Sequence, residues 1–449
     1  MHRRVICAVI ALAPGRGLAD GIAIIGGSPR AIGRAGAATV GDDGGGALLI
    51  NPAAMARRAT LRAQLGAAVV EDDVSWLSDR RNAPRSSSQA GSSIAPLGAA
   101  IGALGSWVLG AGVMTSGVLD RSLPRPGDVH GELSDEFDYR YAGIAGSYRR
   151  DTLAIGAARR IGSSLALGVS LGASRVEVTE HRRLWAGFDG RDVVGDPSGD
   201  VDLELTASDA LTPSAVAGVL YAPEDAQIEL GASVGWSGIA RLDGKVSGVG
   251  TVMGPRVDYT GSRAAHLDVR QPVTVRAGGR YVGDRVVAEL DGDLWIARDG
   301  ADAAVWSLDG VHVVDVSQVA TELRRLPSRI AQHTHVAVRT AIDVELMPGF
   351  LWATGGYAFA NLATPADHLG PSFGDLGGHT LGLGLEATSG GATISLGWSR
   401  TWSLATRAPS VLRLDNPFAA GDGAVPSGRY DGALDQVGLL VELELASSP

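Results

Sequence analysis

Residues 273–294 read VTVRAGGRYVGDRVVAELDGDL, and this stretch decides the fold. Apolar side chains occupy every second position on both sides of Val282-Gly283, and charged side chains fall on positions between them. Because a β-strand points successive side chains to opposite faces, the pattern predicts two antiparallel strands with one apolar and one charged face. A two-residue loop at this point would place Arg276 opposite Glu289.

The same period-two alternation continues from about residue 58 to the end of the chain, and it is interrupted alternately by short turns and by long polar stretches. Tight turns are expected at Leu104-Gly105, Ile161-Gly162-Ser163, Pro223-Glu224-Asp225, Val282-Gly283, Met347-Pro348 and Ser389-Gly390. Strands are expected to start near residues 58, 94, 106, 139–151, 164, 212, 226, 266, 284, 332, 349, 378, 391 and 432. This rhythm predicts an all-β fold, an antiparallel transmembrane barrel of about fourteen strands, with short turns on the periplasmic side and long loops outside. A water-soluble β-sandwich is the alternative, although its loops would not sort by length.

Composition supports this fold and excludes other classes of protein. Hydrophobic residues make up 45% of the 449 positions, yet no run is long enough for a transmembrane helix. The 63 glycines favour strands and turns over helices. A net charge of −10 without any Lys/Arg-rich run excludes a nucleic-acid partner.

Charged residues on the strands are expected to face the barrel lumen. A charge facing lipid near the bilayer midplane would cost about 2 to 4 kcal/mol, so the opposite face must carry them. The predicted lumen-facing charges are Arg276, Arg280, Glu289, Asp291 and Asp293. Two roles remain open for them: salt bridges that fill the wall and hold a plug, or direct contact with a substrate.

The N-terminus has the order of a secretory signal. Basic residues Arg3 and Arg4 precede an apolar run, and small residues end at Ala19, so residues 1–19 are expected to be a signal peptide. A short buried helix is the alternative. Cys7 lies within this segment, so the mature chain would contain no disulfide or thiolate site.

The next segment carries a motif block. It reads AIGRAGAA at residues 31–38, GDD at 41–43 and ALLINPAAMAR at 47–57. The block resembles the start of the FadL/TodX family of outer-membrane transporters for long-chain fatty acids and hydrocarbons. The residues that carry the resemblance are Gly33, Arg34, Gly36, Asp42, Asp43, Asn51, Pro52 and Ala53. The resemblance implies a fourteen-stranded barrel closed by an N-terminal hatch. The chain departs from the family in ending without an aromatic residue.

Residues 20–57 are expected to form this plug, and residues 58–449 the barrel. The segment lacks strand-length alternation, so it could not span a bilayer with its backbone groups satisfied. Inside the lumen, Arg34 and the Asp42-Asp43 pair would meet charges of the wall, and Asn51-Pro52 would turn the chain toward the first strand.

The function expected from these patterns is passive uptake of hydrophobic small molecules across the outer membrane of a Gram-negative bacterium. Its partners would be the hydrophobic ligand and membrane lipid, and the chain would act as a monomer. Two alternatives stay open: a structural or adhesive barrel whose loops bind partners, and a barrel enzyme acting on lipid. No cofactor or metal is expected, because the His333 and His335 pair has no third ligand nearby in the sequence.

Overall fold

The computed structural model describes residues 27–58, 60–79, 85–88, 92–124, 139–186, 200–250, 255–301, 304–315, 317–408 and 427–446. The expected signal peptide, with Cys7, and residues 20–26 of the expected plug lie outside these ranges. Among the described residues, no helix is both long and apolar enough to cross a membrane.

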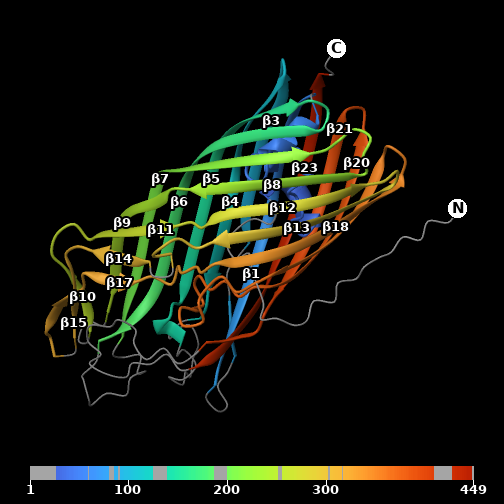
Figure 1. The fold of residues 1–449 in the computed structure, drawn as a ribbon. Helices are drawn as coiled ribbons and strands as arrows, with labels where there is room; N and C mark the ends of the chain where they lie inside the picture. Colours follow the sequence, from blue (N-terminus) through green and yellow to red (C-terminus); the bar gives the residue numbers. More distant parts are fainter. Residues whose placement is uncertain are drawn as a thin grey trace.

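Three short helical segments precede a succession of strands (Figure 1). The helical segments are α1 (Pro29–Gly33), η2 (Gly45–Leu48) and η3 (Pro52–Arg57). The strands of the first half are β1 (Leu61–Ser78), β2 (Arg85–Ser87), β3 (Ser93–Leu104), β4 (Trp107–Ser122), β5 (Ala145–Ile161), β6 (Leu165–Trp185), β7 (Asp200–Tyr221), β8 (Ile228–Ser237), β9 (Ile239–Val249), β10 (Arg256–Tyr259), β11 (Ala264–Arg270) and β12 (Val273–Val282). Those of the second half are β13 (Val286–Ile296), β14 (Val305–Leu308), β15 (Val311–Val314), β16 (Ala320–Glu322), β17 (Arg325–Pro327), β18 (His335–Met347), β19 (Leu351–Ala360), β20 (Gly378–Ser389), β21 (Ala392–Ser403), β22 (Thr406–Ala408) and β23 (Gly428–Ala446).

The strands form a closed antiparallel barrel of 14 strands. Each barrel strand pairs with the next along the chain, and β1 pairs with β23 from Leu61↔Ala446 to Ser78↔Gly428, which closes the ring. Two of the fourteen barrel strands are interrupted, so that each consists of two shorter strands: β8 with β9, and β11 with β12. Closure leaves no open sheet edge, which is the condition for strands to cross a bilayer. The predicted fold class is confirmed.

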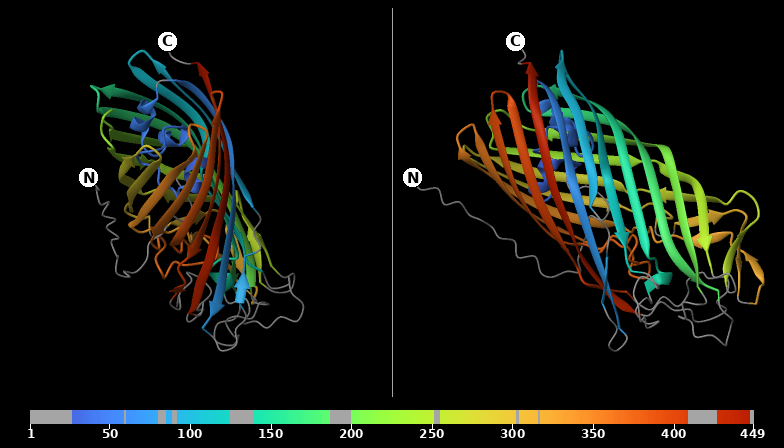
Figure 2. Two further views of the ribbon diagram at one scale, coloured as in Figure 1. Left: turned by 90° about the vertical axis from the view of Figure 1, so that its right-hand side faces the viewer. Right: turned by 180° about the vertical axis from the view of Figure 1, so that it is seen from behind.

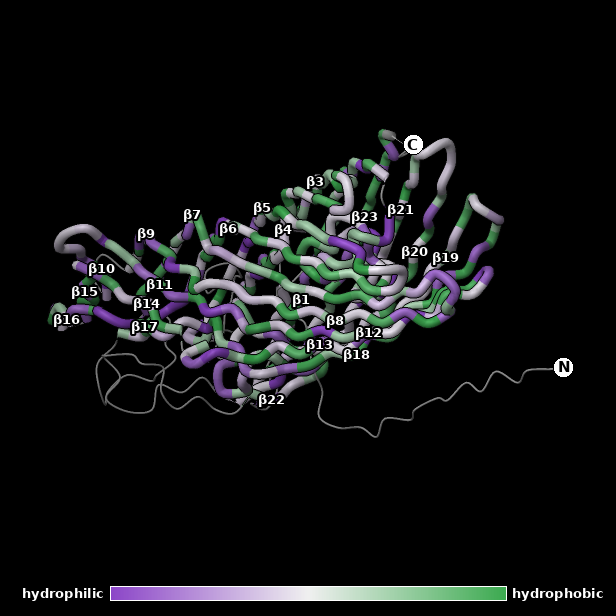
Figure 3. The backbone as a smooth tube through the Cα atoms, turned by 45° about the horizontal axis from the view of Figure 1, so that its top comes forward, coloured by the Kyte–Doolittle hydropathy of each residue, from purple (hydrophilic) through white to green (hydrophobic). Residues whose placement is uncertain are grey.

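An aliphatic belt covers the outside of the barrel. Leu65 is 74% exposed, Ile155 58% and Leu383 59%, and each alternates with a residue that points inward. Figure 3 shows hydrophobic and hydrophilic positions alternating along the strands. Such a band is what the hydrocarbon core of a membrane requires of a barrel surface.

The hairpin of β12 and β13 has the predicted apolar and charged faces but a different register. Val282 pairs with Val287, Arg280 with Glu289 and Arg276 with Asp293, so the predicted pairing of Arg276 with Glu289 is wrong. The cause is the position of the turn: the Gly283 amide bonds to the Val286 carbonyl at 2.9 Å, so the chain reverses at Asp284-Arg285, two residues later than predicted. The partner of Arg276 changes from Glu289 to Asp293, an even number of residues, so every side chain stays on the predicted face of the sheet.

Strand β7 starts at Asp200, well before the expected start near residue 212. Val201, Leu203 and Leu205 alternate with polar residues and are fully buried, so the period-two signal was present in the sequence. A bulge between Ser174 and Val176 lets the β6–β7 pairing continue through this region. The wall therefore extends further toward the long connections than expected.

The long-connection end of the barrel is filled by an apolar core that the sequence did not predict. Inward residues of β6, β7, β9 and β11 pack against segment 304–330, including the buried Trp306. Glu180 of the wall accepts hydrogen bonds from Trp306 Nε1 and Ser328 Oγ, both at 2.8 Å. Beyond it lies a small sheet of β10, β15 and β16, at the lower left of Figure 1.

Candidate functional site

Two capped turns shape the segment from Ser28 to Arg57. Ser28 Oγ accepts a hydrogen bond from the Ala31 amide at 3.3 Å and begins α1. Asn51 Oδ1 accepts one from the Ala53 amide, also at 3.3 Å, and begins η3. In both cases a proline follows the cap, and its fixed φ suits the first helical position. The Asn-Pro-Ala motif therefore acts as a helix cap.

This segment, called the plug from here on, lies inside the barrel (Figure 2). Helix α1 packs against β20, β21 and β23, and η3 against β5, β6 and β7 on the other side. In Figure 1 the plug sits toward the end where the tight turns are. The plug thus crosses the lumen from one part of the wall to another.

Glycines of the wall allow the plug backbone to approach closely. A Cβ added to Gly356 would lie 2.3 Å from the carbonyl carbon of Arg34, and one added to Gly168 would lie 2.3 Å from the Ala53 amide nitrogen. A Cβ added to Gly382 would lie 2.7 Å from the Ala35 amide nitrogen. Any larger side chain would displace the plug, so part of the high glycine content serves the seat of the plug.

Two carboxylates of β13 hold one loop of the plug through its backbone. Asp291 Oδ2 accepts hydrogen bonds from the Ala38 and Thr39 amides at 2.8 and 2.9 Å. Glu289 Oε1 accepts bonds from the Val40 and Gly41 amides at 2.8 and 3.1 Å. Both side chains are buried. Four consecutive backbone amides of the plug are thereby satisfied by carboxyl oxygens of the wall.

Arg34 adds a buried ion pair to this clamp. Its guanidinium lies 2.5 Å from Glu289 Oε2 and 3.2 Å from Asp343 Oδ2. Beside it, Arg339 of the wall donates to the Ala35 carbonyl at 3.0 Å and lies 2.9 Å from Asp293. The expectation that Arg34 meets wall charges is confirmed.

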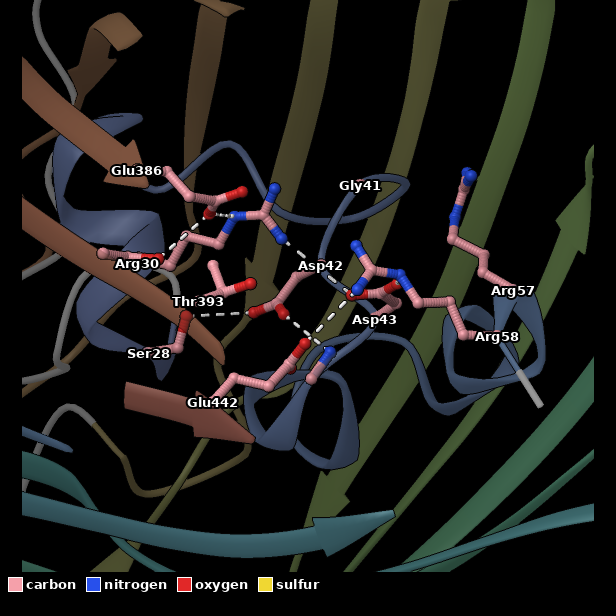
Figure 4. A network of polar contacts seen from close by, with 12 residues as sticks. Ser28, Arg30, Gly41, Asp42, Asp43, Arg57, Arg58, Glu386, Thr393 and Glu442 are labelled. Atoms are coloured by element: carbon pink, nitrogen blue, oxygen red, sulfur yellow. Dashed lines mark hydrogen bonds and ion pairs between the residues drawn. The ribbon is translucent and has the colours of Figure 1, made fainter. Parts of the chain in front are cut away.

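The acidic pair of the plug divides into two roles. Asp43 lies 2.9 Å from Arg58 and 3.4 Å from Arg62 of β1, and the side chains of Arg30, Arg58 and Asp43 converge in Figure 4. Asp42 does not meet a wall charge as expected. It accepts hydrogen bonds from Ser28 Oγ and the Gly44 amide, both at 3.0 Å, because it closes a turn within the plug.

These surroundings shift the two carboxyl groups in opposite directions. Burial raises the pKa of Asp42 above its ordinary value, although the Gly44 amide and Arg30 partly oppose it. Burial would also raise the pKa of Asp43, but Arg58, Arg62 and Arg30 together lower it below its ordinary value. Asp43 is therefore the ionised anchor of the pair.

Sequence reasoning missed several partners of the plug. Arg57 forms a two-pronged pair with Glu229 of β8 at 2.9 and 2.6 Å, and Arg30 lies 2.8 Å from Glu386 of β20. Glu229 and Glu386 point inward from their strands, Arg57 ends the motif block and Arg30 directly precedes it, and these positions were the available signal.

Of the five predicted lumen charges, Glu289, Asp291 and Asp293 gather at or beside the plug. Arg280 lies 3.3 Å from Glu229, the partner of Arg57. Arg276 instead lines an internal cavity and lies 3.8 Å from Asp293. Gly33 and Gly36 position the plug backbone, the first against Gly384 of the wall and the second with a φ of 87°.

The cavity beside the plug measures about 200 Å³. Its lining includes Leu49 and Ile50 of the plug, together with Arg150, Arg276 and Trp295 of the wall. Trp295 stacks on His335, with ring centroids 4.7 Å apart and planes 7° from parallel. No group of three or more potential metal ligands occurs within the ranges that the structure describes. The His333 and His335 pair accordingly gains no third ligand there.

No family sequence model matches the chain, and no curated protein matches it in sequence. Solved structures do match. A FadL homologue of Pseudomonas aeruginosa aligns with 13% identity and a TM-score of 0.73, over 95% of this chain and 100% of that one. The toluene transporters TodX of P. putida and TbuX of Ralstonia pickettii align at 15% identity, with TM-scores of 0.63 and 0.61. They cover 95% and 92% of this chain and 100% and 97% of their own.

These identities are low, so the likeness concerns the fold. The alignments extend over nearly the whole of each chain, plug and barrel together. The resemblance drawn from the N-terminal block is therefore confirmed at the level of the fold: the chain has the barrel fold of the FadL and TodX outer-membrane transporters.

Proposed function

We propose that this chain is an outer-membrane transporter for passive uptake of hydrophobic small molecules. The observation that carries the proposal is a lumen closed by a plug, with a cavity that touches both plug and wall. The structures that the chain resembles are named as a FadL homologue, toluene transporters and a monoaromatic hydrocarbon channel, which supports this class of cargo.

The plug is attached to the wall in two ways. Glu289 and Asp43 take part in ion pairs, whereas Leu48 and Met55 of the plug pack in an apolar cluster with wall residues such as Ile101. Polar contacts can be exchanged for water when that side of the plug shifts, whereas the apolar side would resist separation, so a gate would open by movement of the polar side.

We also propose the three-part organisation of signal peptide, plug and barrel, with boundaries at residues 19 and 57. The chain would act as a monomer in the outer membrane and without catalysis. A barrel of this fold supports an outer-membrane location, and the named relatives in structure are transporters and channels. The adhesive alternative predicts no binding of hydrophobic molecules beside the plug, and the enzymatic alternative predicts that a bound lipid is chemically converted.

Tryptophan fluorescence tests this proposal directly, because Trp295 lines the cavity. Toluene and palmitate are each added to the purified full chain in detergent, with glucose as the unrelated solute. We expect saturable quenching by at least one hydrophobic molecule and none by glucose. Trp295→Phe should remove most of the signal, whereas Trp107→Phe, at a lipid-facing position 44% exposed, should retain it. Absence of quenching by both hydrophobic molecules would overturn the proposal.

A further inference from the structure

The cavity beside the plug is not a plain apolar pocket. Its wall combines rings with cations: Trp295 and His335 form a stacked pair, Tyr148 lies near them, and Arg150 and Arg276 also line the space. A neutral hydrocarbon could accept no hydrogen bond from the two guanidinium groups and would have to displace water from them. The lining therefore indicates a ligand with both a ring and a polar end.

Arg150 is the cation best placed to receive that polar end. Its Nε donates to Ser174 Oγ and one terminal nitrogen to Ser237 Oγ, both at 3.0 Å. Among the described residues, no carboxylate lies within ion-pair distance of this guanidinium. A guanidinium carries five N–H donors in a planar fork that matches a carboxylate, and two neutral hydroxyls leave most of that capacity unused.

The local charge balance points the same way. Arg298 donates to the Ser237 carbonyl at 2.8 Å, so a second guanidinium stands close to the first through the same residue. Arg276 has only a distant acid, Asp293 at 3.8 Å, and that acid lies closer to Arg339, at 2.9 Å. The one acid lining the cavity is Asp375, which accepts the Gly377 amide at 3.2 Å. The space thus carries a surplus of positive charge within the described part of the chain.

The volume of the cavity suits a small ring. A cavity of roughly 150 Å³ is sufficient to bind benzene. The 200 Å³ found here has room for one ring with a small substituent. An aromatic wall favours a ring, which can stack or meet it edge to face.

We propose that this cavity binds a single-ring aromatic carboxylate, with its carboxylate on Arg150 and its ring against Trp295 and His335. This inference rests on the proposed function and narrows its cargo to an anionic aromatic compound. Arg150 then discriminates between a charged and a neutral ring, and Arg276 and Arg298 add favourable potential.

Binding of three probes to the purified full chain tests the proposal. Benzoate supplies ring and anion, toluene the ring alone, and hexanoate the anion alone. We expect benzoate to bind most tightly. Arg150→Gln should weaken benzoate roughly ten- to a hundredfold, the range expected for hydrogen bonds to a charged group, and leave toluene unchanged. Arg150→Lys should recover part of the loss.

Arg149→Gln is the matched control, because Arg149 is adjacent but lies on the outer face of β5, 2.8 Å from Asp151. It should leave all three affinities unchanged. If toluene binds as tightly as benzoate, or if Arg150→Gln weakens both equally, the assignment of an anionic ligand is overturned while the transport proposal stands. If no hydrophobic or aromatic probe binds, the proposed function fails, and this inference fails with it.

Discussion

Removing the carboxylate of Glu289 should release the plug. Glu289→Ala deletes the ion pair with Arg34 and the acceptor of the Val40 and Gly41 amides. All of these contacts join the plug to the wall, so their loss destabilises the docked plug and leaves the undocked one unaffected. Among the described residues, Asp343, at 3.2 Å, would remain as the ion-pair partner of Arg34.

The size of the effect follows from the burial of the pair. Breaking a buried ion pair by removing one partner costs about 3 to 5 kcal/mol, because the remaining charge stays buried and uncompensated. That range corresponds to an increase of roughly two to four powers of ten in the ratio of undocked to docked plug. Glu289→Gln keeps an oxygen for the two amides but loses the charge, so its effect should be smaller.

Single-channel conductance in a planar bilayer measures the outcome. The native chain should be closed for most of the recording, whereas Glu289→Ala should open frequently. Glu444→Ala removes an exposed carboxylate near the barrel rim and should behave as the native chain does. The double variant Arg34→Gln/Glu289→Gln should open less than the sum of the single effects, because the two groups act on each other. A Glu289→Ala variant that stays closed, with its plug resistant to protease, would refute the role of this clamp.

Three further predictions follow from the plug seat and the lipid face. Asp43→Asn should weaken plug docking at neutral pH. Because the pKa of Asp43 is lowered when docked, its contribution is present above the ordinary carboxyl pKa and is lost as pH falls through the lowered value, so conductances of variant and native chain should converge in acid. Gly356→Val should open the channel, because the added Cβ would collide with the backbone of Arg34. Gly355→Val is the control, because a Cβ at that position meets nothing within 4 Å, and it should leave the channel closed. Equal conductances of the two variants would contradict the close packing of the plug against the wall. Leu383→Arg should lower the unfolding free energy in lipid vesicles by about 2 to 4 kcal/mol, and an unchanged value would mean that this face does not meet lipid.

The barrel could be predicted from the sequence because two signals agreed. Alternation fixes which residues share a face, and tight turns fix where the chain reverses. The Gly390-Gly391 turn, with both φ values positive, has the two-residue loop that such a pair favours. The register predicted for Val282-Gly283 was wrong because the chain reverses two residues later, and the position of a turn depends on backbone hydrogen bonds that composition does not reveal.

The site was only partly predictable. The motif block indicated a plug, and the charges of β13 were correctly placed on the lumen face. Which plug atoms they contact could not be foreseen, because Glu289 and Asp291 bind backbone amides, and every residue has one. The cavity also escaped prediction, since Arg150, Arg276 and Trp295 come together only when the ring of strands closes.

Uptake by intact cells tests the central claim most directly. Gram-negative cells that produce the full chain are supplied with a labelled hydrophobic molecule such as toluene or palmitate, or with a labelled sugar, and compared with cells lacking the chain. The account predicts faster entry of at least one hydrophobic molecule and unchanged entry of the sugar. Equal uptake of the hydrophobic molecules by both kinds of cell, with the barrel correctly folded in the outer membrane, would contradict it.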